Sequence, residues 1–161
     1  MKKKVIIIGA GGFASVVMET IEKLNEYTII GFAVDNLPIN TIVFNHYSII
    51  SDCALSSINT DNNTYFIVAI GDNYTRTHFF ETAKNKFQPL TLIDPSAKIS
   101  KYSKIGEGTI ILANTIIHPN SSIGSNCIIN AGVIIDHDCT IGSNIHLNIG
   151  TVVPSKSKII I

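Results

Sequence analysis

The second half of the chain repeats every six residues. An aliphatic residue stands at each sixth position through the end of the chain: Ile93, Ile99, Ile105, Ile111, Ile117, Ile123, Ile129, Ile135, Ile141, Leu147, Val153 and Ile159. Four residues after each of the first eleven, Ala, Ser, Thr or Cys occupies nine positions. This period matches neither a helix nor a strand. It predicts stacked coils with flat sides, each side sending one aliphatic side chain inward, which is the hexapeptide form of a β-helix.

The first half has another rhythm, in which apolar strands alternate with amphipathic helices. We expect strands at 5–9, 27–35 and 64–72 and helices at 13–24 and 77–87. Such alternation indicates a parallel sheet covered by helices. The segment from Leu37 to Asn63 is expected to be irregular and to end in a polar loop at 59–63. The chain is therefore predicted to contain an α/β, Rossmann-like domain at 1–89 and a β-helix domain at 90–161.

The composition excludes several classes of protein. Hydrophobic residues make up 45% of the chain, charged residues 15%, and the formal net charge is zero. Zero net charge argues against nucleic acid or an anionic membrane as the partner. The three cysteines form no CxxC pair, which favours a reducing compartment. With no apolar run long enough to span a membrane, we expect a soluble, cytoplasmic protein.

A glycine-rich turn follows the first predicted strand. Gly9, Gly11 and Gly12, with Phe13, belong to a G-x-G-x-x-A pattern between a strand and a helix. Such glycines let backbone N–H groups approach a phosphate, and the helix N-terminus favours its charge. Asp35, at the end of the next strand, is placed to accept hydrogen bonds from a ribose or a base. A nucleotide-sugar, NAD and a purely structural turn are the alternatives. The short first domain favours the nucleotide-sugar, because the repeat leaves no room for an oxidoreductase's catalytic domain.

A second group of polar residues follows the strand predicted at 64–72. Gly71, Asp72, Asn73 and Arg76 would lie at the same sheet edge, where open parallel sheets bind ligands. Arg76 is a candidate phosphate ligand. Asp72 either faces this ligand or caps the following helix.

Three ionisable residues in a row, Asp136, His137 and Asp138, interrupt the repeat. They lie between the inward positions Ile135 and Cys139, so the period predicts that they face outward at or near a corner. A neutral imidazole can act as a general base, and a neighbouring carboxylate can orient it. The alternative is a solvated surface histidine. A metal site is disfavoured, because consecutive extended residues point in alternating directions.

Several motifs together resemble one protein family. They are IIIGAGGFA (6–14), GFAVDN (31–36), AIGDNYTR (69–76), DPSAKIS (94–100) and NAGVIIDHD (130–138). The chain resembles the bacterial hexapeptide-repeat sugar acetyltransferases, which include UDP-4-amino-sugar N-acetyltransferases and the sialic acid O-acetyltransferase group. The resemblance implies a left-handed β-helix that binds acetyl-CoA, a first domain that holds a UDP-linked sugar, and active sites between the subunits of a homotrimer.

The resemblance also implies roles for particular residues. His137 becomes the general base in a direct transfer to an amino group. Asp138 becomes its orienting acid, with Asp136 as the fallback. Asn130 matches a position that helps to place the sugar, and His146 matches a histidine near the acetyl donor. No metal is implied.

The chain departs from the family pattern at several points. Phe13 stands where histidine is usual, Val34-Asp35 where paired acids are common, and Asp94 where histidine is common. The chain also stops at Ile161, whereas the family usually continues with further coils. Two alternatives to sugar N-acetylation stay open. One is O-acetylation of a sialic acid or similar sugar, and the other is a truncated, non-catalytic nucleotide-sugar-binding protein.

Overall fold

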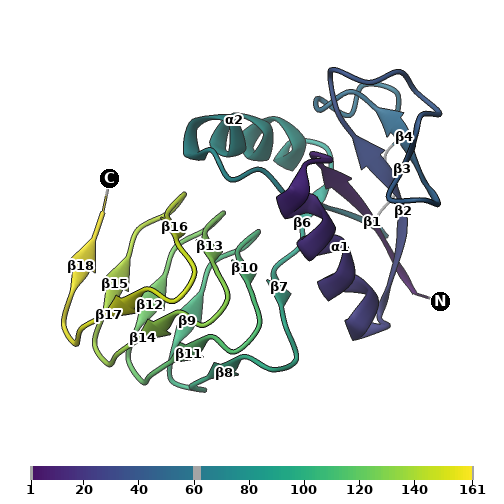
Figure 1. Ribbon diagram of the computed structural model, residues 1–161. Coiled ribbons are helices and arrows are strands. Elements are labelled where there is room, and N and C mark those ends of the chain that lie inside the picture. Colours follow the sequence, from purple (N-terminus) through teal and green to yellow (C-terminus); the bar gives the residue numbers. More distant parts are fainter. Residues whose placement is uncertain (1, 60–62, 161) are drawn as a thin grey trace. The chain divides into compact units, whose positions relative to one another are not determined.

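A computed structural model describes residues 2–59 and 63–160. The chain divides into two compact units, Met1–Leu90 and Thr91–Ile161 (Figure 1).

The first unit is a sheet with two helices. Its elements are β1 (Lys3–Ile8), α1 (Gly12–Leu24), β2 (Tyr27–Ala33), β3 (Ile42–Val43), β4 (Tyr47–Ser51), β5 (Thr64–Val68), α2 (Asn73–Lys84) and β6 (Gln88–Pro89). The strand order is β3-β4-β2-β1-β5-β6. The pairs from β4 to β6 are parallel, and β3 pairs with β4 in the antiparallel direction. The predicted α/β parallel sheet is therefore confirmed.

The apolar run of β1 supplies the centre of this sheet. Ile6 and Ile8 pack in one cluster with Phe80 and Ala83 of α2. Successive strand residues point to opposite faces, so Val5 and Ile7 point to the other face. Helix α1 packs beside β1 and β2 and buries Ala14, Val17 and Ile21. A strand covered on both sides needs an apolar residue at every position, which explains the unbroken VIII sequence.

The segment expected to be irregular contains two strands, so this expectation was wrong. Strands β3 and β4 form a hairpin whose turn includes Phe44 and Asn45, with φ angles of 48° and 67°. Positive φ usually selects glycine, and a phenylalanine there gives no turn signal in the sequence. The predicted polar loop at 59–63 lies partly outside the described residues. Helix α2 begins at Asn73, four residues earlier than expected.

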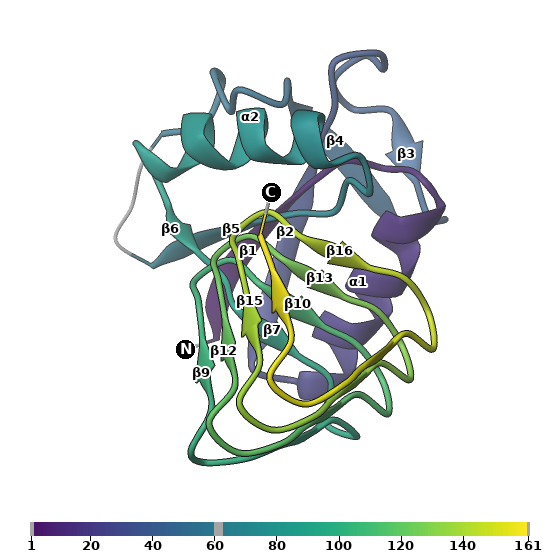
Figure 2. The same cartoon turned by 90° about the vertical axis from the view of Figure 1, so that its left-hand side faces the viewer.

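The second unit is a stack of short parallel strands, each two residues long. They are β7 (Leu92–Ile93), β8 (Lys98–Ile99), β9 (Lys104–Ile105), β10 (Ile110–Ile111), β11 (Ile116–Ile117), β12 (Ser122–Ile123), β13 (Ile128–Ile129), β14 (Ile134–Ile135), β15 (Thr140–Ile141), β16 (His146–Leu147), β17 (Val152–Val153) and β18 (Lys158–Ile159). They form three sheets, ordered β16-β13-β10-β7, β17-β14-β11-β8 and β18-β15-β12-β9. Figure 2 looks along the stack, where the coils overlie one another. This is the predicted left-handed β-helix.

The aliphatic period fills the inside of the coils. Residues Ile111, Ile117, Ile123, Ile129, Ile135, Ile141, Leu147 and Val153 form one buried cluster. Ile99, Ile105 and Ile159 pack against it and are partly buried. Ile93 departs from the pattern with 36% exposure, because it belongs to the first coil of the stack.

Some of the small residues four positions after the aliphatic ones also form hydrogen bonds between coils. The hydroxyl of Thr109 donates to the carbonyl oxygen of Gly124 at 2.8 Å and accepts from the amide of Cys127 at 3.1 Å. The hydroxyl of Ser121 likewise donates to Asp136 O at 2.7 Å and accepts from Cys139 N at 3.0 Å. These side chains join one coil to the next from inside. Their polar groups are therefore satisfied although buried.

The corners of the coils share one backbone conformation. Every sixth residue from 108 to 156 has a φ between 55° and 70°: Gly108, Asn114, Asn120, Asn126, Gly132, Asp138, Asn144, Gly150 and Lys156. This left-handed conformation is easiest for glycine and is tolerated well by asparagine and aspartate. Asp138 thus occupies one of these corner positions, and the corner conformation itself does not require its carboxylate.

Candidate active site

A pocket of about 460 Å³ lies in the first unit, where β1, β2 and β5 end. Six predicted substrate-binding residues line it: Gly9, Gly11, Gly12, Phe13, Asp35 and Gly71. The carboxyl ends of parallel strands are the usual ligand site of such sheets. The sequence did not point to Val34, Asn36, Cys53, Ala69 and Ile70, which also line the pocket.

The three glycines of the turn differ in what requires them. Gly9 has a φ of 103°, and a Cβ there would lie 2.9 Å from Cγ1 of Ile70 and 3.0 Å from the carbonyl oxygen of Ala69. The fold therefore requires glycine at position 9. A Cβ at Gly11 or Gly12 would meet no atom within 4 Å. Packing does not explain these two glycines, whereas close approach of a ligand does.

The first turn of α1 faces this pocket. Gly11 is the N-cap, no side chain caps the helix there, and its first turn carries no acidic residue. Helix α2 differs, because the carboxylate of its N-cap, Asp72, accepts from Thr75 N at 2.8 Å. A hydrogen bond from the Thr75 side chain, followed by this one from the Thr75 backbone amide, lowers the pKa of Asp72. An uncapped helix N-terminus with glycines in front of it suits an anion such as a phosphate.

Asp35 is held at the pocket wall by the segment between β4 and β5. Its Oδ1 atom accepts a hydrogen bond from the backbone amide of Cys53 at 2.8 Å. Burial, and then the negative charge of Asp35, raise the pKa of the Cys53 thiol to about 12, so the thiol stays neutral. Among the described residues, neither lysine nor arginine lines the pocket. A bound phosphate would therefore be met there by backbone N–H groups.

Three other predicted substrate-binding residues of the first unit, Asp72, Asn73 and Arg76, lie outside this lining. Asp72 caps α2, the alternative considered for it. Arg76 is only 1% exposed. Its guanidinium donates to the carbonyl oxygens of Ile70 and Gly71 and to the side chain of Asn73.

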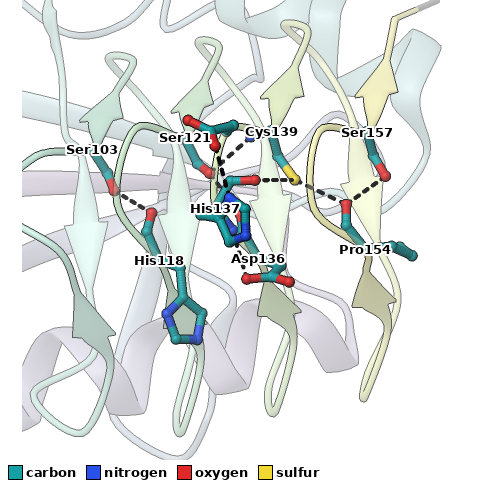
Figure 3. Close-up of polar contacts among 9 residues, drawn as sticks. Ser103, His118, Ser121, Asp136, His137, Cys139, Pro154 and Ser157 are labelled. Carbon is teal, nitrogen blue, oxygen red and sulfur yellow. Dashed lines mark hydrogen bonds and ion pairs between the residues drawn. The ribbon is translucent and has the colours of Figure 1, made fainter.

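In the second unit, the Asp136-His137-Asp138 run lies at a coil corner, as predicted. His137 and Asp138 are exposed, while Cys139 belongs to the buried core cluster. The thiol of Cys139 donates to the carbonyl oxygen of Pro154 on the next coil at 3.1 Å (Figure 3). The Nδ1 atom of His137 lies 2.7 Å from Oδ2 of Asp138, with side-chain exposures of 51% and 41%. The hydrogen bond with His137, followed by one from the Asn120 side chain, lowers the pKa of Asp138. The ring is thus held through Nδ1, and Nε2 is the nitrogen left for chemistry.

The neighbouring candidates have different surroundings. The Oδ1 atom of Asp136 accepts from the His137 backbone amide at 2.8 Å, so the ring contact belongs to Asp138. Oδ1 of Asn130 accepts from the amide of Ala131 at 2.8 Å. His146 begins β16, directly above Ile128 of the preceding coil, and is half-buried.

Two family models match the chain. The PglD N-terminal domain matches residues 4–83, and the bacterial transferase hexapeptide model of six repeats matches residues 102–137. No curated protein sequence matches significantly.

Solved structures match both units together. A histidine-to-asparagine variant of perosamine N-acetyltransferase from Caulobacter crescentus, in complex with CoA and GDP-perosamine, has a TM-score of 0.86 and 29% identity, covering 96% of this chain and 73% of that one. PerB from the same organism, with the same two ligands, has a TM-score of 0.80 and 31% identity, covering 92% and 70%. This chain belongs to the hexapeptide-repeat sugar acetyltransferase family. The acetyltransferase domain of PglB from Neisseria gonorrhoeae has a TM-score of 0.84 and 25% identity, covering 98% and 85%.

As a member of this family, the chain is an acyltransferase. Within residues 2–59 and 63–160, no three His, Cys, Asp or Glu side chains are grouped to hold a metal ion. In the same ranges, no helix has the length and apolar character needed to cross a membrane.

Proposed function

We propose that this acetyltransferase transfers the acetyl group of acetyl-CoA to the amino group of a nucleotide-linked amino sugar, with His137 as the general base. The observation that carries the proposal is the 2.7 Å contact between His137 Nδ1 and Asp138 Oδ2 on an exposed coil corner. A base must be accessible, and a carboxylate on Nδ1 fixes the tautomer that leaves Nε2 able to accept a proton.

The proposed reaction is a direct transfer. The amine nitrogen of the sugar attacks the thioester carbonyl carbon, and Nε2 of His137 takes a proton from that nitrogen. The carbon–sulfur bond then breaks, and the imidazolium returns the proton to the leaving thiolate of CoA. Asp138 stabilises the imidazolium between these steps, as a carboxylate does in other acyl-transfer sites.

We assign the nucleotide to the pocket of the first unit. Gly11 and Gly12 leave room for a phosphate at the start of α1, and Asp35 offers a carboxylate to a ribose or a base. Our initial expectation is a UDP-linked sugar. The Caulobacter enzymes are complexed with GDP-perosamine, so UDP-linked and GDP-linked amino sugars should both be tested as acceptors.

We further propose that the active form is a homotrimer in the cytoplasm. The outward positions of β11, β14 and β17 are Ile116, Ile134 and Val152, an apolar column in which Val152 is 64% exposed. A partly exposed apolar column of this kind supports association between subunits. The absence of a disulfide among the three cysteines, all of them described, supports a reducing compartment.

The test is CoA release from acetyl-CoA, measured as free thiol, with UDP- and GDP-linked amino sugars and with sialic acids as acceptors. Release with an amino sugar, lost in His137→Ala, supports the proposal. Release with a sialic acid alone would identify an O-acetyltransferase. Nucleotide-sugar binding without release would indicate a non-catalytic binding protein. Sedimentation of the protein separately measures the size of the oligomer.

A further inference from the structure

We propose that Arg76 is a positioning residue for the nucleotide pocket. It hydrogen-bonds to the backbone of residues that line the pocket and does not contact the phosphate itself. The inference rests on the proposed function, since it assumes that the pocket at Gly9–Gly12 holds the nucleotide. It concerns how that pocket keeps its shape.

The side chain of Arg76 is directed into the protein. It is 1% exposed, and its Nη1 atom donates to the carbonyl oxygens of Ile70 at 3.2 Å and Gly71 at 2.9 Å. Its Nη2 atom donates to Oδ1 of Asn73 at 2.7 Å. A buried guanidinium is tolerated only when its donors are satisfied, and these three acceptors belong to one short turn.

That turn is part of the pocket. Ile70 and Gly71 both line it. The turn also meets the glycine turn on the neighbouring strand, since a Cβ on Gly9 would lie only 2.9 Å from Cγ1 of Ile70. The amide of Ala69 donates to the carbonyl oxygen of Ile8 at 2.8 Å, which joins the two strand ends. A shift of Ile70 would therefore move both walls of the nucleotide site.

The chemistry of the side chain fits this task. Arginine carries five donors in a rigid plane, so one guanidinium can hold two carbonyl oxygens and an amide oxygen at fixed directions. Lysine has a single ammonium nitrogen on a flexible stem and cannot reproduce this geometry. Arg76→Lys would keep the charge and release part of the turn. Asn73→Ala would remove one acceptor and leave the arginine in place.

The experiment measures both Michaelis constants in Arg76→Lys and Asn73→Ala. We expect the KM for the nucleotide-sugar to rise about tenfold, the scale of a lost hydrogen bond to a charged group. The KM for acetyl-CoA and kcat should change by less than about twofold, because only binding of the nucleotide depends on this wall. Asn85→Ala is the control. It removes a side chain of the same type at the other end of α2, where Nδ2 donates to Glu81 O at 3.1 Å.

The outcomes separate this inference from the proposed function. An unchanged nucleotide-sugar KM in both variants, or an equal rise in Asn85→Ala, would overturn it even if His137→Ala abolishes turnover. If the unaltered protein shows no turnover, calorimetric titration with UDP and GDP measures nucleotide binding in place of the Michaelis constants. Weaker nucleotide binding in the two variants then supports the role of Arg76, and absence of nucleotide binding in the unaltered protein refutes it. If Arg76→Lys fails to fold, Asn73→Ala decides.

Discussion

Alanine at two glycines of the same turn should have opposite effects on the free energy of unfolding. Gly12→Ala should stabilise the first unit and weaken nucleotide binding. Gly9→Ala should destabilise the unit. The contrast follows from the surroundings of the two residues, which lie three positions apart in one short turn.

The magnitudes can be worked from the geometry. Gly12 starts helix α1, and a Cβ there would meet no atom within 4 Å. Alanine should therefore gain about 0.4–1 kcal/mol by restricting the unfolded chain. Gly9 has a φ of 103°, and its added Cβ would lie 3.0 Å from a backbone oxygen. Such a backbone conformation costs a residue with a Cβ about 1–3 kcal/mol, before any cost of the overlap.

The effect of Gly12→Ala on nucleotide binding should be opposite to its effect on stability. The new methyl group of Gly12→Ala lies at the pocket lining and would hold a phosphate away from the backbone N–H groups. Loss of one hydrogen bond to a charged group corresponds to a Kd at least about tenfold higher.

Urea denaturation followed by the helical circular dichroism signal measures the stability, because α1 and α2 both belong to the first unit. Calorimetric titration with UDP and GDP measures the binding. A Gly12→Ala protein that is stabilised and still binds the nucleotide normally would falsify the assignment of this turn to the phosphate. A Gly12→Ala protein as unstable as Gly9→Ala would refute the packing argument.

Three further predictions concern the β-helix. His137→Ala should lower kcat by about 10²- to 10⁴-fold, the contribution of a general base, with an unchanged thermal unfolding midpoint. Asp138→Asn should keep the corner, since asparagine fits its φ of 62°. The lowered pKa of Asp138 keeps its carboxylate charged as the pH falls through the usual aspartate range. Asp138→Asn should therefore lower kcat by more than about tenfold, because the neutral amide cannot stabilise the imidazolium formed during transfer, and an unchanged kcat would contradict the dyad. Gly124→Ala should cost about 3 kcal/mol in urea denaturation, because its Cβ would lie 2.5 Å from Ser143 N. Gly142→Ala, with its nearest contact at 3.4 Å, should cost under about 1 kcal/mol, and equal costs would contradict the stacking.

The β-helix was predictable because each coil requires an aliphatic side chain at the same inward positions. The inward position of Ile117 repeats at Ile135 and Val153, so one misread residue would not have hidden the period. The outward placement of His137 followed from the same count. Its pairing with Asp138 was expected only from the family resemblance, because the six-residue count places both residues at the corner without fixing how their side chains are oriented toward each other.

The first unit was less predictable, because its details depend on contacts between distant segments. Cys53 reaches Asp35 across eighteen residues of sequence. Nothing local to Cys53 signals that its amide fixes a pocket carboxylate. The direction of Arg76 depends likewise on where the carbonyl oxygens of Ile70 and Gly71 lie after folding. A charged residue beside a ligand site reads the same in sequence whether it faces the ligand or supports the wall.

The stacked corners have a consequence for how such a scaffold can change. Asn120, Asp138 and Lys156 occupy one corner on successive coils with nearly the same φ, at 63°, 62° and 63°. Neighbouring strands in a sheet are about 4.8 Å apart, so a side chain exchanged between these positions moves along the axis in steps of that length. A histidine and acid pair placed at Pro119 and Asn120 would lie one such step away on an unchanged backbone. The coil therefore sets a fixed interval by which a reactive group can be shifted to suit acceptors of different length.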